Sequence, residues 1–514
     1  RTVLGAGPGV PPAVPMGLLD AIGEAARRML QGLTARDHGM RRLWEVIELV
    51  LAILRGVVRF GLAVHPQGFD AIDDYDWREW LAINGASEAS LRSAFMRGIY
   101  NLCMAYEGGD EARPALSAAC ALRGSVRMFF GYRGTLFWRM TSGMGDVVFA
   151  PIYEVLRRRG VRFEFFHRLE HVELAAPQPG AGTRVAALHF DVQAELAGEA
   201  YEAYEPLVDV RGLPCWPSQP CWSQLRDGPA LREAGWDAEC WWDRTPARRR
   251  VLRADHDFDV AVLAVGLGAV APACRELVAR EPRWHDMVTR LQAVATQAFQ
   301  VWMRADMRQL GWAEGPINLA GFKPPFETWS DMRHLLPEES WPEPPRSLAY
   351  FCSVLPTPAV LPDRDAADYP ERRRREVHDN AAGFLDRDIG HLWPQAVAPE
   401  GGFRWEELVD PGGSVPPRGA EPREAAPGPE RLATQFLTAN VQPTGYYTLS
   451  LPGTSRYRIS PLDSTIENLR VAGDWTESGL NTACIEGAVM SGRLAAHAIA
   501  GSPRLESIVG YDHP

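Results

Sequence analysis

The segment 468–496 constrains the fold of this chain more than any other part of the sequence. It reads as a short apolar strand, 469–472, then Gly473 and Asp474, a polar turn, and a helix that we expect to begin near Thr482. A strand that ends in Gly-Asp brings a carboxylate to its tip, where it can bind a ribose or ribityl hydroxyl. The first N–H groups of the helix have no partner within the helix and can bind the same ligand. The segment therefore predicts a strand–turn–helix unit that holds a cofactor.

Small residues recur along this predicted helix at spacings of three and four positions. They are Cys484, Ala488, Ser491, Gly492 and Ala495. Residues at these spacings share one face of a helix. We expect that face to let a flat ring or another backbone approach closely.

The same segment resembles the C-terminal FAD-closing motif of the flavin amine oxidase and phytoene desaturase superfamily, in which a strand and Ala-Gly-Asp precede a Glu-Gly-Ala helix. The resemblance implies a mixed α/β and α+β fold, with a Rossmann-like FAD-binding domain of the amine oxidase type and a substrate domain of sheet plus helices. A helix dipole near the flavin would favour its reduced, negatively charged form. The residues that the resemblance assigns to FAD here are Gly473, Asp474, Trp475, Thr482, Ala483, Cys484, Ile485 and Ala488.

Two further segments are assigned to the cofactor by the same resemblance. The pattern of residues 147–158 predicts a helix that ends at Gly160, and the pattern of 161–172 predicts a strand. The resemblance places Leu169 of this strand beside the adenine. Residues 258–265 form a continuous apolar run, typical of a buried strand. The resemblance makes Val265 and Gly266, at its end, contacts of the flavin nucleotide.

The glycines at 5–9 invite comparison with the GxGxxG turn that holds a dinucleotide pyrophosphate. Only Thr2, Val3 and Leu4 stand between Arg1 and these glycines, which is too short for the strand that precedes such a turn. Prolines then follow where the helix should begin. We interpret this stretch as a proline-rich loop. We expect the sequence to lack the dinucleotide-binding segment and to be incomplete or processed at its N-terminus.

Composition excludes several classes of protein. The chain has 514 residues, of which 46% are apolar and 23% charged, as in a globular protein of two or three domains. Its net charge of −11 and the lack of a basic patch with interleaved aromatic residues argue against a nucleic-acid partner. The eight cysteines form no CxxC pair, so we expect no metal site, no disulfide framework, and a cytoplasmic location.

The chain divides into four regions by pattern. We expect a mainly helical substrate or cap region at 1–140, the middle of the FAD-binding domain at 141–280 with an insertion at 175–250, a substrate domain at 281–430 with an exposed loop at 398–430, and the C-terminal FAD-binding segment at 431–514. Within these regions we also predict helices at 17–36, 40–64 and 285–303 and a strand at 347–355.

The helix predicted at 40–64 carries one narrow charged stripe among apolar faces. Charges interrupt it too often for a membrane span. We favour burial in a substrate domain, and a peripheral helix in a membrane interface stays open.

Two clusters of titratable residues have simple structural interpretations. Asp73, Asp74 and Asp76 precede or open a predicted helix, where acidic residues suit the helix dipole. His167 and His171 share a strand face without a third ligand nearby, so we expect no metal there. The Trp-rich stretch at 206–242 is expected to pack under a long insertion rather than to form a lid.

The substrate class depends on one position. In amine oxidases a Tyr commonly precedes the Glu-Gly-Ala helix and forms one wall of an aromatic cage; this chain has Cys484 there, one residue before Ile485. Tyr446 and Tyr447 are candidates to face a substrate. Ala-Gly-Asp-Trp-Thr is closer to carotenoid desaturases and hydroxysqualene-processing flavoproteins, whose substrates are long and apolar.

We therefore predict an FAD-dependent oxidoreductase that moves a hydride from a small apolar, isoprenoid-like or carotenoid-like substrate to the flavin. Such chemistry needs positioning more than a strong acid–base pair. Two alternatives stay open: a flavin amine oxidase, and an incomplete or non-catalytic fold remnant that acts as a binding module. The sequence assigns no catalytic residue and no oligomeric state.

Overall fold

The computed structural model describes residues 17, 21, 38–131, 137–198, 203–245, 248–341, 343–410 and 426–511. The glycine-rich stretch at 5–9, nearly all of the helix predicted at 17–36, and residues 411–425 of the loop predicted at 398–430 lie outside these residues.

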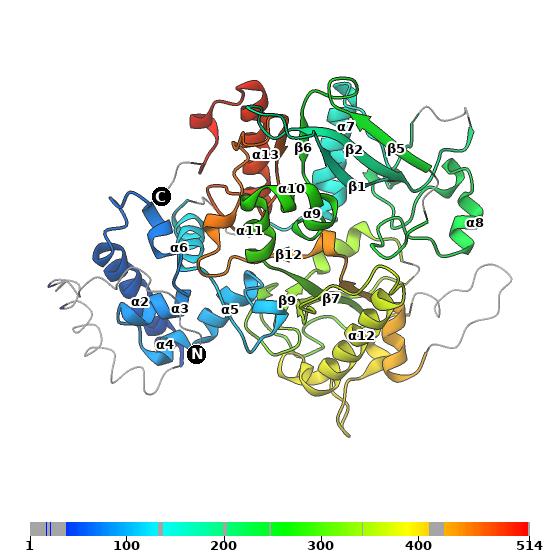
Figure 1. The fold of residues 1–514 in the computed structure, drawn as a ribbon. Coiled ribbons are helices and arrows are strands. Elements are labelled where there is room, and N and C mark those ends of the chain that lie inside the picture. Colours follow the sequence, from blue (N-terminus) through cyan, green and yellow to red (C-terminus); the bar gives the residue numbers. More distant parts are fainter. Residues whose placement is uncertain are drawn as a thin grey trace.

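Short helices make up the N-terminal region, drawn in blue and cyan in Figure 1. Their side-chain caps explain where they begin: Asp76, Ser87, Ser93 and Ser117 each accept a hydrogen bond from a first-turn N–H. The capping by acidic residues that is predicted for Asp73, Asp74 and Asp76 is therefore found at Asp76. The elements are α2 (His38–Arg59), η1 (Gly68–Ile72), α3 (Trp77–Ile83), α4 (Glu88–Leu91), α5 (Ala94–Leu102), η2 (Glu107–Gly109), α6 (Ala118–Val126) and η3 (Arg127–Gly131).

Helix α2 is buried on one side only, so the prediction of a nearly buried helix is wrong for its other side. Leu49 and Ala52 lie in the core, and the carboxylate of Glu48 accepts hydrogen bonds from Ser87 and Ser90. Apolar side chains on the opposite side are 44 to 54% exposed; they are Leu43, Val50, Leu54 and Val58. No helix in the described part of the chain is long and apolar enough to cross a membrane.

A six-stranded antiparallel sheet forms the second region. Its order is β11 (Phe436–Asn440), β7 (Ala293–Met303), β10 (Ser347–Leu355), β9 (Thr328–Asp331) and β8 (Asn318–Leu319), and β12 (Tyr447–Thr448) pairs with the start of β7. The strand predicted at 347–355 is β10. The helix predicted at 285–303 is wrong beyond α11 (Pro282–Arg290), because β7 pairs along its length with both β10 and β11. This tertiary pairing overrides the helix propensity of an Ala- and Gln-rich sequence.

One face of this sheet carries the largest core. Phe299 and Phe351 stack with their ring centroids 4.8 Å apart, and Phe384 of α12 (Tyr369–Arg387) packs against both rings. Trp241 and Trp242 join this core, as expected for packing rather than a lid. Phe403 and Leu408 are buried in it as well, and Val409 is also buried, so the prediction of an exposed loop is wrong for residues 403–410.

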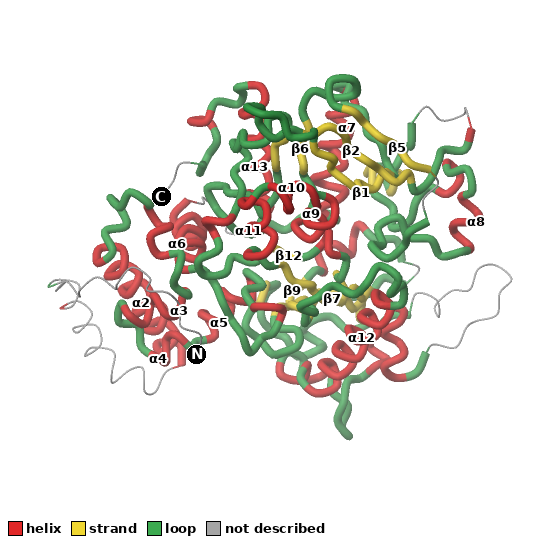
Figure 2. Tube along the Cα trace, viewed as in Figure 1, coloured by secondary structure: helices red, strands yellow, loops and turns green. Residues whose placement is uncertain are grey.

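The third region contains two small sheets and the helices beside them (Figure 2). One sheet is antiparallel, with β2 (Val185–Val192) between β1 (His167–Leu174) and β5 (Arg248–Arg253). The other pairs β6 (Ala261–Leu263) and β13 (Leu469–Val471) in parallel. The neighbouring helices are η4 (Gly145–Phe149), α7 (Ala150–Arg158), α9 (Leu267–Ala273), α10 (Arg275–Arg280) and α13 (Ile485–Ala500).

Two strand predictions are corrected in this region. Residues 161–166 are not a strand: Phe163, Phe165 and Phe166 pack with Tyr153 and Tyr204 in an aromatic cluster instead of pairing with another strand. The apolar run 258–265 yields only the three residues of β6. Its Val260 and Val262 are 39% and 45% exposed, so the strand is not buried on both faces.

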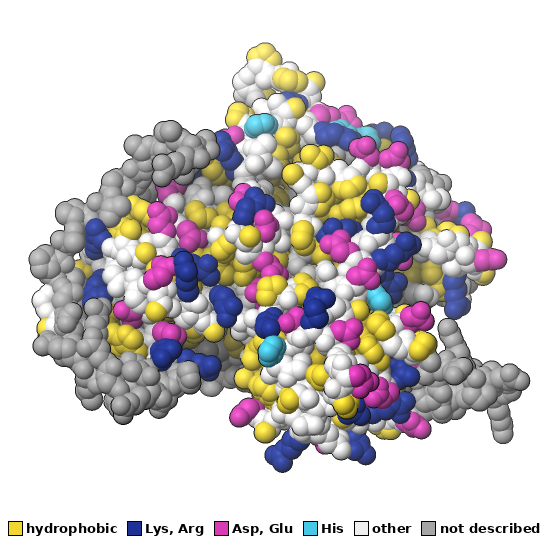
Figure 3. Space-filling model, turned by 90° about the horizontal axis from the view of Figure 1, so that it is seen from below, with side chains coloured by type: hydrophobic (Ala, Val, Ile, Leu, Met, Phe, Trp, Pro, Cys, Tyr) yellow, Lys and Arg dark blue, Asp and Glu magenta, His cyan; other side chains and the backbone are white. Residues whose placement is uncertain are grey.

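The remaining elements are short connections. They are β3 (Val208–Val210), β4 (Leu213–Cys215), η6 (Trp222–Gln224), α8 (Gly228–Glu233), η7 (Arg333–Glu338), η8 (Ile389–His391), η9 (Pro394–Ala396), η10 (Trp405–Glu407), η11 (Gly428–Thr434), η12 (Pro443–Gly445), η13 (Ser455–Tyr457) and η14 (Leu505–Ser507). The mixed helix and sheet class is confirmed, whereas the four domain bounds stay a prediction. On the surface shown in Figure 3, basic and acidic side chains are interspersed.

Candidate functional site

Three chain segments meet where the parallel strands β6 and β13 end. The indole Nε1 of Trp475 donates a hydrogen bond to the carbonyl oxygen of Val265, 2.8 Å away, and so joins the two strand ends. The loop after β6 also lies against η12, because a Cβ added to Gly266 would come within 2.2 Å of the carbonyl oxygen of Thr444. The turn before Tyr446 and Tyr447 is therefore held beside the tip of β13.

Gly473 has a backbone conformation that favours glycine, with φ at +139°. Its N–H donates to the hydroxyl of Ser491 in α13 at 2.8 Å, and its carbonyl accepts from the Thr476 hydroxyl at 2.8 Å. A Cβ at this position would lie 2.9 Å from Nε1 of Trp475. These contacts fix how the chain turns from β13 toward α13.

Asp474 follows directly and is held from two sides. Its Oδ1 accepts a hydrogen bond from the Thr448 hydroxyl at 3.4 Å, and its backbone carbonyl accepts one from Nη1 of Arg458 at 2.7 Å. Burial raises the pKa of the Asp474 carboxyl, while Arg458 and Thr448 oppose this shift. Arg458 is itself only 1% exposed, and burial lowers its pKa. The site thus contains a buried cation next to the predicted ribityl ligand.

Cys484 caps the N-terminus of α13. Its Sγ accepts a hydrogen bond from the N–H of Gly487 at 3.3 Å, and the helix starts at Ile485 rather than near Thr482. Burial raises the pKa of this thiol to about 11, which keeps it protonated near neutral pH. A protonated thiol is a weaker nucleophile than a thiolate.

The small residues of α13 do not all share one environment, which corrects the single face expected from their spacing. Ser491 and Ala495 are buried, and Ser491 bonds Gly473. Ala488 and Gly492 are exposed, as are Ile485 and Val489 at 45% and 57%. The buried side fixes the helix to β13, and the exposed side leaves apolar surface near the helix start.

Tyr446 and Tyr447 lie on different sides of the backbone. The hydroxyl of Tyr447 donates to the carbonyl oxygen of Ala483 at 2.9 Å, and this ring packs in the helical core beside Cys103. Tyr446 packs with the sheet core on the α12 side. Only Tyr447 is therefore brought to Cys484.

The remaining predicted positions lie in the core around the two parallel strands. Leu169 and Val265 both pack, half-buried, against the cluster that contains Val172 and Leu469. His167 and His171 bond Phe165 and Glu276 respectively, and no group of three metal-binding side chains occurs within the described ranges.

Sequence reasoning missed Thr448 and Arg458 as site residues, and it placed Ser491 on the small-residue face without its hydrogen bond to Gly473. Thr448 stands next to Tyr447, which could have pointed to it. Arg458 lies in an irregular segment after η13, and no sequence pattern marks it as a buried partner of the Asp474 backbone.

Tyr447 also connects this site to one face of the six-stranded sheet. Alternate residues of the sheet point away from the α12 core, and Tyr447 is on that side because it pairs with Val294. We call this the open face. Its half-exposed members are Thr296, Gln300, Trp302, Tyr350, Cys352 and Thr438.

The residues at the strand tip fit the flavin end of FAD. Asp474 offers acceptor oxygens for sugar-like hydroxyls, and α13 presents the N–H groups of its first turn. Exposed Ile485, Ala488 and Val489 provide apolar surface that a flat ring can cover. These residues would hold FAD, and its flavin would act as a two-electron acceptor.

Comparison with known proteins gives a family for the C-terminal segment. Residues 417–500 match the model of the family described as flavin containing amine oxidoreductase. No curated protein matches the chain.

Two solved structures have limited similarity to the chain. Cyclohexylamine oxidase from Brevibacterium oxydans IH-35A has 15% identity over 86% of this chain and 70% of its own length, with a TM-score of 0.41. An oxidoreductase from Methanosarcina mazei has 15% identity over 48% of this chain, with a TM-score of 0.27. The match spans 44% of the Methanosarcina protein, less than half of its length.

The site geometry and the family model agree on the same residues, since β13, Asp474 and α13 all lie within 417–500. The similarity to the flavin containing amine oxidoreductases therefore covers the segment that carries the candidate FAD site.

Proposed function

We propose that this chain is an FAD-dependent oxidoreductase that oxidises an apolar, isoprenoid-like substrate. The observation that carries the proposal is the thiol of Cys484 at the N-cap of α13. An aromatic cage for an amine needs two facing rings. Among the described residues, no aromatic ring pairs with that of Tyr447, and its hydroxyl is committed to Ala483.

The residues of the site have separable roles in this proposal. Asp474 binds a hydroxyl of the cofactor, and the first turn of α13 supports negative charge on it. Tyr447 and the open face form the side from which a substrate approaches. When bound, FAD supplies the acceptor for a hydride from an activated C–H bond.

Positioning and exclusion of water account for the rest of the chemistry. Two histidines of the antiparallel sheet pair with carboxylates: His171 of β1 with Glu276 of α10, and His189 of β2 with Glu173 of β1. Neither pair lies at Tyr447. The proposal therefore assigns no general acid or base to a histidine. The open face offers hydroxyl and amide groups that can orient one polar end of a mainly apolar substrate.

Oxidation of an amine is a second candidate. One observation favours it: Tyr447 puts one aromatic ring beside the helix start where an amine oxidase would need it. Because Cys484 stands where amine oxidases commonly have a Tyr, only one of the two aromatic rings that an amine cage needs is supported here.

Anaerobic reduction of the FAD-loaded protein tests the two candidates directly. We expect an isoprenoid hydrocarbon to bleach the visible flavin bands and cyclohexylamine to leave them unchanged. Cys484→Tyr should raise the rate with the amine, while Cys484→Ala serves as the matched control that adds no ring. Bleaching of the unmodified protein by amines alone would overturn the proposal.

A further inference from the structure

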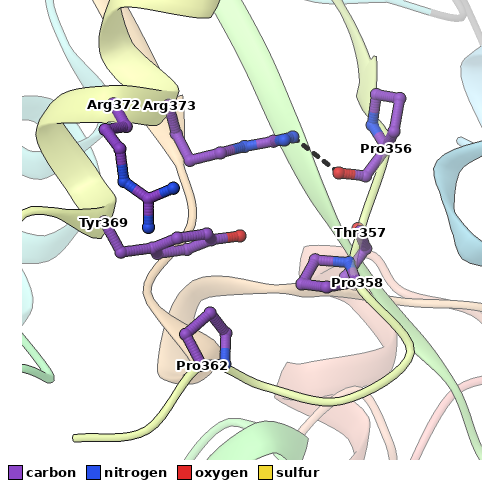
Figure 4. A pocket seen from close by; sticks show the side chains of 7 residues that line it. All are labelled: Pro356, Thr357, Pro358, Pro362, Tyr369, Arg372 and Arg373. Atoms are coloured by element: carbon purple, nitrogen blue, oxygen red, sulfur yellow. Dashed lines mark hydrogen bonds between the residues drawn. The ribbon is translucent and has the colours of Figure 1, made fainter. Parts of the chain in front are cut away.

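The pocket in front of α12 contains polar groups that the proposed oxidation does not use. It has a volume of about 400 Å³, within the range of small-molecule sites. Prolines 356, 358 and 362 form its apolar wall, and Tyr369 and Arg373 from the first turn of α12 form the opposite wall (Figure 4). The pocket is thus apolar on one side and carries hydrogen-bond donors on the other.

Two buried donors that line this pocket, and a third beside it, show no well-formed hydrogen bond in the described part of the chain. They are the hydroxyl of Tyr369, the hydroxyl of Tyr446 and Nε of Arg373. Tyr369 is only 6% exposed, and Figure 4 shows its hydroxyl directed into the pocket. Burial raises the pKa of both tyrosines, and each is also shifted by the other's hydroxyl and by Arg373, so the three groups lie close together. The two hydroxyls can interact with each other, but one such contact satisfies only one of their two O–H donors. The remaining O–H and Nε of Arg373 point to an acceptor that the protein does not itself provide.

The other atoms of Arg373 are already committed. Nη2 donates to the carbonyl oxygen of Pro356 at 2.6 Å, and Nη1 lies 2.8 Å from Glu376. Arg372 likewise pairs with Asp368 at 2.8 Å. Because each guanidinium has a carboxylate partner, the pocket carries little excess positive charge. A ligand with one negative charge suits it better than a dianion such as phosphate.

We propose that this pocket binds a small organic carboxylate. The carboxylate oxygens accept from Tyr369, Tyr446 and Arg373, and the apolar body packs against the prolines. Tyr446 thus lies beside Tyr369 of this pocket and not on the side of Tyr447.

Calorimetric titration with benzoate tests the proposal on the full chain loaded with FAD. We expect saturable binding of benzoate, no binding of the neutral analogue benzamide, and weak or no binding of inorganic phosphate. Tyr369→Phe and Tyr446→Phe should each weaken benzoate binding roughly two- to tenfold, as expected for loss of one hydrogen bond. Tyr153→Phe, in the aromatic cluster beside α7, should leave it unchanged.

Three results would overturn the carboxylate site. They are no saturable binding up to about 10 mM, equal binding of benzoate and benzamide, and equal affinity in the protein and in both Tyr→Phe variants at this pocket. The first would mean that ordered water satisfies the three donors. The comparison of benzoate with benzamide uses the unmodified protein, so it decides the matter even if a variant fails to fold.

Discussion

The hydroxyl of Tyr447 donates a hydrogen bond to the carbonyl oxygen of Ala483, which precedes the N-cap of α13. This contact joins β12, at the edge of the six-stranded sheet, to the segment that follows β13. In the function that we propose, this phenol links the substrate side to the cofactor side. The predictions below test this link and the contacts around it.

Tyr447→Phe removes this hydrogen bond and keeps the ring. We expect the free energy of unfolding to fall by about 1 kcal/mol, because the Ala483 carbonyl loses its phenol donor. Urea denaturation measures the loss, and the flavin spectrum of the loaded variant should shift because the start of α13 is less firmly held. An unchanged unfolding energy together with an unchanged spectrum would mean that the contact is not formed in solution.

Gly473→Ala should destabilise the protein by about 1–3 kcal/mol. Both its φ of +139° and the 2.9 Å approach of a Cβ to Trp475 oppose a side chain. Gly492→Ala is the matched control, since a Cβ there has no atom within 4 Å and lies in a helix, where alanine is favoured by about 0.5–1 kcal/mol. Thermal unfolding of the two variants should move in opposite directions. A loss of stability in both would point to general sensitivity of this segment.

Much of the secondary structure near the site follows from the sequence. Gly473-Asp474 after an apolar strand and the helix of small residues predict β13, the turn and α13 to within three residues, because strand period and glycine conformation are local properties. The 285–303 helix prediction fails for β7, because pairing with β10 and β11 decides its structure. Arg458 could not be assigned from local pattern, since its contact with the Asp474 backbone depends on how distant segments pack.

Glu111 should make stability depend on pH. Its Oε1 accepts from the Ser353 hydroxyl at 3.4 Å, and burial, followed by repulsion from Glu327, raises its pKa from 4.5 to about 7. The folded state thus binds this proton more tightly than the unfolded state. The stabilisation that the protonated Glu111 carboxyl contributes to the folded state is fully present below pH 4.5 and is lost as pH rises toward 7.

Glu111→Gln should remove that part of the pH dependence. Urea unfolding at about pH 5 and about pH 8 measures it. Glu88→Gln, at a side chain that is 68% exposed, is the control and should keep the full slope. A slope that is the same in Glu111→Gln as in the unmodified protein would contradict the assignment.

Glu170 ties β1 to two distant loops through Arg244 at 2.7 Å and Arg364 at 3.2 Å. Burial alone would raise the pKa of Glu170, but hydrogen bonds from these arginines outweigh it and lower the pKa. Its stabilisation is therefore present above the ordinary carboxyl pKa and is lost as pH falls. Glu170→Gln should cost about 2 kcal/mol near neutral pH and less in acid.

Glu371→Gln provides the comparison for Glu170. Its exposed i,i+4 pair with Arg375 should contribute less than about 0.5 kcal/mol at any pH. Equal losses in the two variants, measured by urea unfolding, would contradict a special role for the Glu170 cluster.

The measurement that tests the account most directly is FAD binding to this chain and to Asp474→Ala, followed by the visible absorption that stays with the protein after desalting. The account predicts retained flavin bands for the unmodified protein and a clear loss in the variant. Asp463→Ala is the control, because the Asp463 carboxylate is also largely buried but pairs with Arg283. Equal retention by all three proteins would show that Asp474 does not hold the cofactor, and the site built on the end of β13 would be wrong.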